Sequence, residues 1–157
     1  MLVVNATGTF NNCESYANEL SGFDASGSSN PSVHDCKFQG SKESCGIVLF
    51  ETATGTFENC ESFANELSGF FAMGSSNPVV KGCKFHGSKK GTGISLRENA
   101  AGTFIDCESF ANELGGIYRS RATEHTVKNC HFRDGEVSRD EFSGRIPPPS
   151  GVFWRIR

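Results

Sequence analysis

The sequence predicts an all-β solenoid: a right-handed parallel β-helix of about five to six coils, with 23 or 24 residues in each coil. The first observation behind this prediction is a repeat of 47 residues, since Ala-Thr-Gly-Thr-Phe begins at Ala6 and Ala53 and Ala-Ala-Gly-Thr-Phe begins at Ala100. The second is a shorter period of 23 or 24 residues within that repeat. The third is that the apolar stretches are short, β-rich and separated by Gly, Asn-Pro, Ser and Thr. Crossover chirality favours the right-handed form.

Cysteines define the shorter period, because six of the seven follow one another at steps of 23, 24, 23, 24 and 23 residues. Three residues before each stands an apolar residue, alternately Phe and Val. The cysteine row comprises Cys13, Cys36, Cys60, Cys83, Cys107 and Cys130, and the apolar row comprises Phe10, Val33, Phe57, Val80, Phe104 and Val127. We expect each row to form a structural ladder, in which successive residues lie about 4.8 Å apart along the stack. Large and small side chains then alternate, which helps a narrow core to pack closely.

Two other repeat architectures have similar lengths. Leucine-rich repeats match the shorter period, but Leu is scarce here and their Leu/Asn spacing is absent. Helical repeats match the 47-residue period, but Gly, Asn-Pro, Ser and Thr are too densely placed for two helices per repeat. We interpret residues 46–51 and 56–63 as strands, which makes two short strands per unit, separated by turns.

The cysteine row has three chemical interpretations. A zinc site usually needs local pairs such as Cys-x-x-Cys, which this chain lacks. A spacing of about 4.8 Å would permit disulfides by distance alone. Side chains on parallel vectors fit a row of small buried thiols better. Cys45 lies outside the row, and it is either the reactive thiol of the chain or an ordinary turn residue.

Two polar rows accompany the cysteines. The residue after each cysteine alternates in charge, which keeps like charges apart and sets the register of the stack: Glu14, Lys37, Glu61, Lys84, Glu108 and His131. The residue before each cysteine is Asn or Asp, with Gly82 as the exception: Asn12, Asp35, Asn59, Gly82, Asp106 and Asn129. Short polar side chains at a bend bond neighbouring backbone groups, so we expect this row to be structural.

Residues 93–104 (Gly-Ile-Ser-Leu-Arg-Glu-Asn-Ala-Ala-Gly-Thr-Phe) and 77–87 (Asn-Pro-Val-Val-Lys-Gly-Cys-Lys-Phe-His-Gly) resemble right-handed β-helix repeats. They are most similar to those of carbohydrate-binding and sugar-hydrolase (CASH-type) domains, including the β-helix of an F-box substrate-recognition family, within the pectate-lyase-like superfamily. The resemblance covers about residues 5–135 and implies the fold rather than a chemistry. This chain departs from the pattern by placing Cys where an inward Asn is usual.

The ends differ from the repeats. Residues 1–135 form the repeat region, which begins in the middle of a coil, and residues 136–157 form a non-repeat tail that either caps the last coil or docks on another molecule. We expect partner contacts from Trp154, Phe153, Arg119 and Arg121. An open first coil exposes strand edges, so we expect a homo-oligomer formed through the N-terminal end.

Composition excludes several functions. The net charge is −3 with scattered positive residues, so we expect no nucleic-acid partner. No apolar run reaches the roughly 18 to 20 residues of a membrane span, so no membrane partner is expected. Met1–Asn5 lacks the features of a signal peptide, which predicts a cytoplasmic protein with reduced cysteines.

The expected function is non-catalytic recognition or scaffolding, with a protein partner or an oligosaccharide as ligand and with no cofactor or metal. The alternative is a carbohydrate-active enzyme, a polysaccharide lyase or glycoside hydrolase, or a fragment of one. Such an enzyme needs carboxylates that converge on one groove. Most acidic residues here repeat regularly, as scaffolding residues do. Thr7-Gly-Thr9 and Thr54-Gly-Thr56 also match the Thr-x-Thr motif of ice-binding β-helices, but they recur only on every second coil.

Overall fold

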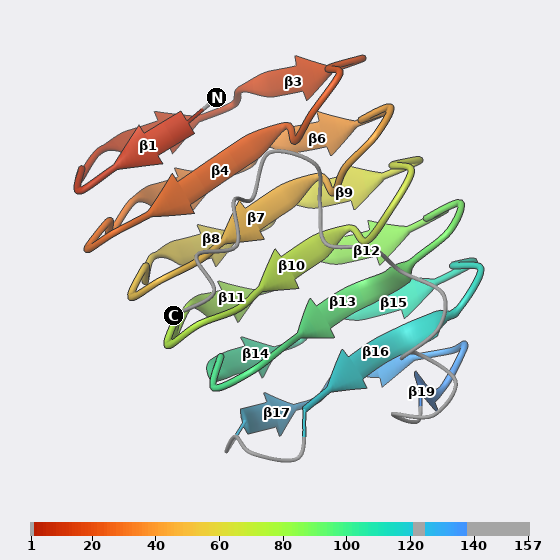
Figure 1. Ribbon diagram of the computed structural model, residues 1–157. Coiled ribbons are helices and arrows are strands. Elements are labelled where there is room, and N and C mark those ends of the chain that lie inside the picture. Colours follow the sequence, from red (N-terminus) through yellow and green to blue (C-terminus); the bar gives the residue numbers. More distant parts are fainter. Residues whose placement is uncertain (1, 121–124, 138–157) are drawn as a thin grey trace.

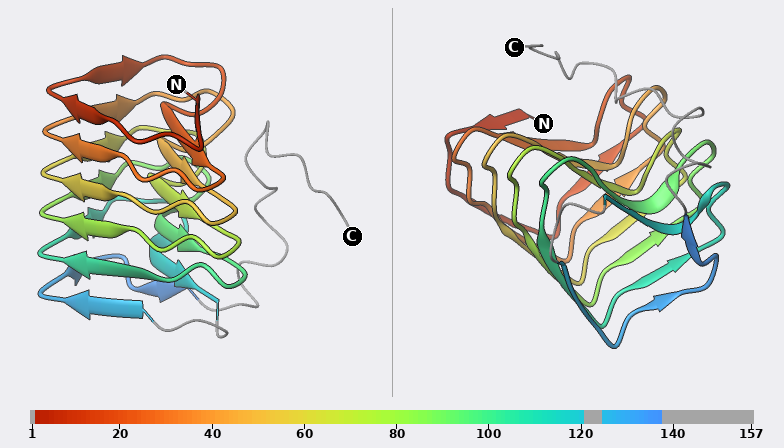
Figure 2. Two further views of the ribbon diagram at one scale, coloured as in Figure 1. Left: turned by 90° about the vertical axis from the view of Figure 1, so that its left-hand side faces the viewer. Right: turned by 60° about the horizontal axis from the view of Figure 1, so that its bottom comes forward.

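The computed structural model describes residues 2–120 and 125–137 (Figure 1). Three parallel sheets run along one rod, and each turn of the chain adds one strand to each sheet (Figure 2). The described residues contain strands and turns but no helix. Over the same residues, no helix is long and apolar enough to span a membrane. The structure thus confirms the all-β parallel solenoid that the repeat predicts.

Every third strand belongs to the same sheet. Sheet A contains β1 (Leu2–Val4), β4 (Phe23–Ser26), β7 (Ile47–Leu49), β10 (Phe70–Ala72), β13 (Thr92–Leu96), β16 (Gly115–Arg119) and β19 (Glu136–Val137). Sheet B contains β2 (Thr9–Asn11), β5 (Ser32–His34), β8 (Thr56–Glu58), β11 (Val79–Lys81), β14 (Gly102–Ile105) and β17 (His125–Lys128). Sheet C contains β3 (Glu14–Tyr16), β6 (Lys37–Gln39), β9 (Glu61–Phe63), β12 (Lys84–His86), β15 (Glu108–Phe110) and β18 (His131–Phe132).

Each coil therefore has three strands, and the interpretation of two per unit is wrong. Residues 56–63, taken as one strand, are β8 and β9, separated by Asn59 and Cys60. Asn59 has φ 53°, in the left-handed region, so the chain turns a corner there instead of continuing extended. Asn and Asp tolerate this conformation better than other residues with a side chain. The Asn/Asp row marks the corner between sheets B and C in every coil.

The core is a single column of apolar side chains enclosed by the three sheets. The register pairs Phe10 with Val33, Val33 with Phe57 and so on along sheet B, so Phe and Val alternate along the stack. Phe57 and Phe104 contact Phe70 of sheet A edge-to-face, with ring centroids 5.5 and 5.9 Å apart. Such contacts add to the stabilisation that area burial provides. At the two ends Phe10 is half-buried and Val127 is 37% exposed, since each lacks one neighbouring coil.

The corner between sheets C and A explains why the true repeat spans two coils. In one coil the Ser62 hydroxyl donates to the carbonyl of Gly69 (2.7 Å) and accepts from Asn65 Nδ2 (3.1 Å). Asn65 Oδ1 also accepts the Ser41 N–H of the preceding coil (3.1 Å). A Cβ on Gly46 would lie 1.9 Å from Ser62 Oγ, so only Gly fits there, and Gly occupies the equivalent position in the neighbouring coils as well. The residues that alternate are the corner pair, which is Ser62 and Asn65 in one coil and Phe85 and Ser88 in the next.

Candidate functional site

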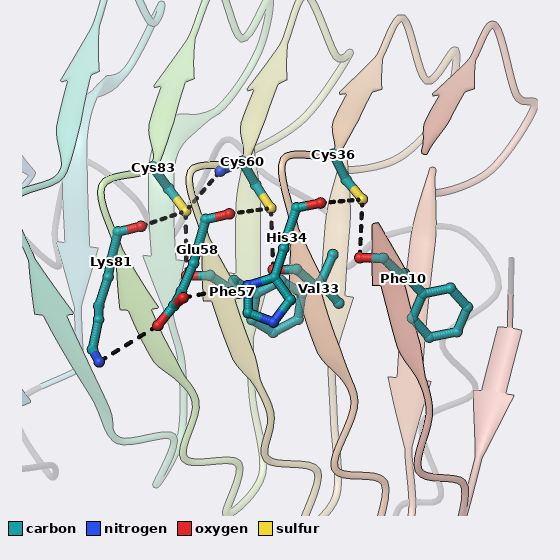
Figure 3. A network of polar contacts seen from close by, with 9 residues as sticks. All are labelled: Phe10, Val33, His34, Cys36, Phe57, Glu58, Cys60, Lys81 and Cys83. Atoms are coloured by element: carbon teal, nitrogen blue, oxygen red, sulfur yellow. Dashed lines mark hydrogen bonds and ion pairs between the residues drawn. The ribbon is translucent and has the colours of Figure 1, made fainter. Parts of the chain in front are cut away.

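A row of thiols lines the inside of the corner between sheets B and C (Figure 3). The Cys60 thiol lies 3.3 Å from the Glu58 carbonyl oxygen and 3.5 Å from that of Val33, to which it can donate. The Cys60 N–H in turn donates to Cys83 Sγ (3.3 Å). The same pattern links Cys13 to Cys36 and Cys107 to Cys130. Each thiol therefore provides a hydrogen-bond partner for backbone N–H and C=O groups that are buried at this bend.

Burial leaves Cys36 and Cys107 poorly suited to react, whereas a hydrogen bond with the Cys83 side chain lowers the pKa of Cys60. All seven cysteines are free. Burial raises the pKa of Cys36 to about 11 and that of Cys107 to about 12. At neutral pH these groups are protonated and poor nucleophiles, since the thiolate is the reactive form. Among the described residues, no group of three His, Cys, Asp or Glu is placed to hold a metal ion.

The environments of two cysteines depart from the sequence-based expectation, and that of Cys45 decides between the two alternatives left open for it. Cys45 is 1% exposed, and burial raises its pKa to about 12. The suggestion that it is the reactive thiol is therefore wrong. Cys13 is exposed and Cys130 is half-buried, although their row was expected to be buried. Each lies in a terminal coil of the described residues, which has a described neighbouring coil on one side only.

The outside of the same corner carries a notch, which we call the corner notch. Its volume is about 350 Å³, and its lining comes from three successive coils. The lining residues are Asp35, Cys36, Lys37, Asn59, Cys60, Glu61, Gly82 and Lys84. Stacking thus brings together three short segments that lie 23 or 24 residues apart in the sequence.

Gly82 leaves the space that the notch occupies. It has φ 60°, the same left-handed corner conformation as Asp35 (φ 53°) and Asn59 (φ 53°). Where those residues carry a polar side chain, Gly82 has none. The nearest atom to a Cβ built on Gly82 is Asn59 Oδ1, at 2.8 Å. That distance is too short for a normal contact, so an added side chain would displace the Asn59 amide as it enters the notch.

Some of the charges around the notch have partners and some do not. On the sheet B side, Glu58 contacts His34 Nδ1 (3.3 Å) and Lys81 Nζ (3.5 Å). On the sheet C side, Glu61 Oε1 lies 2.9 Å from His86 Nε2. Within the described part of the chain, no ion pair within 4.0 Å involves Asp35, Lys37 or Lys84.

The charge row that follows the cysteines does alternate in space, because the register places Lys37 between Glu14 and Glu61. Its members nevertheless do not pair with one another within 4.0 Å in the described residues. Glu61 pairs with His86 of the neighbouring row instead. The lysines of this row are thereby left available at the notch.

A stack of rings stands beside the notch on the outer face of sheet C. The His86 ring lies between those of Phe63 and Phe110, with centroids 5.2 and 4.6 Å away and planes within 5° of parallel. The Arg133 guanidinium lies 5.8 Å from the Phe110 ring centroid, at the end of the stack. Because the rings cover one another's faces, the stack rigidifies the sheet and positions His86 against Glu61.

Of the partner-contact residues expected from the sequence, the structure describes Arg119 alone, and Arg119 does not line the notch. Arg119 is on β16 and pairs with Glu136 through two hydrogen bonds, of 3.0 Å from Nε and 2.5 Å from Nη2. Arg121, Phe153 and Trp154 lie outside the described residues. Sequence reasoning noted Gly82 as the exception in its row but missed the notch, because the exception has a consequence only when neighbouring coils are stacked.

Comparison with known proteins supports the architecture. The family model described as a right-handed β-helix region matches residues 1–89 and residues 80–146. No curated protein and no solved structure matches the chain.

Proposed function

Because this chain belongs to the right-handed β-helix family, we propose that it is a non-catalytic recognition or scaffolding β-helix whose corner notch binds an oligosaccharide. The observation that carries the proposal is the notch that opens where Gly82 interrupts the polar corner row. Its volume of about 350 Å³ lies within the range of small-ligand sites, roughly 300–1,000 Å³. The resemblance of residues 77–87 and 93–104 to CASH-type, pectate-lyase-like repeats favours a sugar ligand.

The lining groups suit a polyhydroxylated ligand. Asn59 offers a donor and an acceptor, the carboxylates of Asp35 and Glu61 accept, and the lysines donate. These groups recur at the coil spacing of about 4.8 Å, which is comparable with the length of one pyranose ring. A sugar chain that runs along the rod would therefore meet a polar group at equivalent positions of successive coils, with Lys37, Glu61 and Lys84 in turn.

An acidic oligosaccharide fits better than a neutral one. Lys37 and Lys84 line the notch without a carboxylate partner among the described residues. An ammonium group that has no internal partner can bond a carboxylate of the ligand, and such charge-assisted hydrogen bonds are the stronger kind. The net charge of −3 for the chain does not oppose this binding, since screening limits the charge interaction to about 8–10 Å.

The test is equilibrium binding of a panel of acidic and neutral oligosaccharides by calorimetry, on the wild type and two glycine variants. Gly82→Asn restores the residue type found at equivalent corners and fills the notch, so we expect binding to fall at least tenfold. Gly87→Ala is the matched control: Gly87 has φ 66°, a Cβ there would make an ordinary contact with Ala64 (3.5 Å), and equivalent corners carry Ala64 and Ala111. We expect Gly87→Ala to bind as the wild type does. Equal binding by Gly82→Asn and the wild type, or no binding of any oligosaccharide, overturns the proposal.

A second candidate function is glycoside hydrolysis, because two carboxylates, Asp35 and Glu61, line the same notch. Hydrolases of this kind use a pair of carboxyl groups that flank the bond to be broken. The discriminating measurement is the release of reducing ends from the same panel, with and without calcium. Turnover that Asp35→Asn and Glu61→Gln each abolish would establish the enzyme. Binding without turnover supports recognition.

A further inference from the structure

The outer face of sheet A carries an apolar patch that is separate from the core. We call it the outer patch: Cys45, Val48, Leu67, Phe71 and Met73, with exposures of 1, 0, 5, 1 and 7%. Val48 alternates with Ile47 and Leu49, both of which belong to the core. Successive side chains of a strand point to opposite faces, so Val48 points outward, and the register places Phe71 next to it.

No described strand explains why this patch is buried. Figure 1 looks onto the outer face of sheet A, with sheets B and C behind it, and none of the described strands lies in front. On sheet C, by contrast, the outward residues Lys37 and Lys84 are exposed. A fully buried outward Phe on a solvated face would require a cover.

Charged groups at the margin of the patch are also removed from water. Asp24 shares the row of Val48 and Phe71, and burial raises the pKa of its carboxyl. The Arg97 guanidinium lies 5.5 Å from the Phe71 ring centroid, and burial lowers its pKa. The patch therefore has an apolar centre and a margin of both charges, as an interface does.

The C-terminal segment has the composition and the reach to cover the patch. Its apolar residues are Phe142, Ile146, Val152, Phe153, Trp154 and Ile156. The chain enters it from β19, which pairs with β16 at the edge of sheet A. The four strand spacings from β19 back to β7 amount to about 19 Å, whereas twenty extended residues reach roughly 66 Å.

We propose that residues 138–157 dock on the outer face of sheet A of their own chain, with apolar side chains over Val48, Phe71 and Met73. Pro147, Pro148 and Pro149 favour an extended, stiff segment, which reduces the entropy lost on docking. Docking there covers the face of the rod. It differs both from capping the last coil and from binding another molecule.

Trp154, the only Trp of the chain, reports on this contact without a label. We expect a blue-shifted emission maximum in the native full-length protein. Phe71→Asp should shift that maximum to the value of a free tryptophan amide and increase acrylamide quenching several-fold. The fold should survive, because the same row already carries Asp24, and circular dichroism checks this.

Two controls distinguish the other places where the segment could bind. Val127→Asp alters the last coil, where Val127 is 37% exposed, and we expect it to leave the Trp154 emission unchanged. Dilution should also leave the emission unchanged, since the contact is within one chain. The proposal is overturned if Val127→Asp shifts the emission and Phe71→Asp does not, which indicates a cap. It is equally overturned if dilution shifts the emission, which indicates a second copy, or if native Trp154 emits as an exposed indole.

Discussion

At the residue scale, the buried cysteines are small core side chains that also form weak hydrogen bonds with the backbone. The Cys83 side chain is fully buried, and its sulfur accepts the Cys60 N–H while contacting the carbonyls of Phe57 and Lys81. An Asn at this position would satisfy the same backbone groups with a larger side chain. Cys fills a narrower space and still provides a weak donor and a weak acceptor.

We predict that Cys83→Ala lowers the free energy of unfolding by about 1–3 kcal/mol, because it leaves the buried Cys60 N–H without its acceptor and creates a small cavity. Cys13→Ala is the control: Cys13 is exposed, so its removal should change stability by less than about 0.5 kcal/mol. Urea denaturation of both variants measures the difference. Equal losses in the two variants would contradict the role assigned to the buried thiols.

Alkaline pH should destabilise the protein. Burial raises the pKa of Cys107 from its ordinary value near 9 to about 12, so above pH 9 the unfolded chain loses a proton that the folded chain keeps. The contribution of this thiol to the free energy of unfolding is therefore fully present below about pH 9. It falls as the pH rises toward 12, by about 1.4 kcal/mol per pH unit for one such thiol. Urea midpoints at pH 8, 10 and 11 measure this fall. Cys107→Val should show a smaller slope, and an identical slope would contradict the assignment.

The corner residues could be predicted from the sequence, whereas the notch and the burial of Cys45 could not. The spacing of Asn12, Asp35 and Asn59 is visible in the sequence, and it predicts a corner because these residues suit left-handed backbone. That Gly82 opens a notch is not visible, because the space depends on Asn59 and Asp35 in neighbouring coils. The burial of Cys45 was missed for a similar reason: the apolar residues around it come from other coils.

At the element scale, alternate coils meet at the corner between sheets C and A through a network of hydrogen bonds. Asn65 is fully buried and contacts Ser62, Phe38 and the N–H of Ser41. Sequence reasoning interpreted residues 56–63 as one strand. Periodicity alone does not locate a corner of two residues between strands of three residues.

We predict that Asn65→Ala costs about 1–3 kcal/mol of stability, since it leaves the buried Ser41 N–H without its acceptor and removes the hydrogen bond that Asn65 donates to the Ser62 hydroxyl. The equivalent change in the first repeat, Asn18→Ala, should cost less, because Asn18 is half-buried and its side-chain amide donates to the Ser15 hydroxyl (2.9 Å) without a buried N–H to satisfy. Thermal unfolding of the two variants ranks them. An Asn18 variant less stable than the Asn65 variant would contradict this account of the corner.

At the scale of the whole molecule, the first coil leaves apolar groups accessible. Tyr16 is 67% exposed and Leu20 is 43% exposed. A cavity of about 180 Å³ lies among residues that include Phe10, Phe23 and Phe38 of the first two coils. Solenoid ends of this kind pair readily, since their strand edges have free hydrogen-bonding groups.

We predict that the protein self-associates through its first coil, as measured by sedimentation velocity over a concentration series. The double variant Tyr16→Glu/Leu20→Glu should shift the distribution toward monomer. Val127→Glu, at the other end of the rod, should have no effect if two first coils meet and should also disrupt assembly if copies stack head to tail. A wild-type monomer at all concentrations would contradict the prediction.

Ligand binding at the corner notch requires that segments 23 or 24 residues apart form one site across stacked coils. Backbone amide shifts in heteronuclear NMR, followed during titration with the acidic oligosaccharide that binds tightest, test this claim directly. We expect the largest perturbations in three separate stretches, residues 35–37, 59–61 and 82–84, with one common dissociation constant. Perturbations confined to a single stretch, or centred on sheet A, would contradict it.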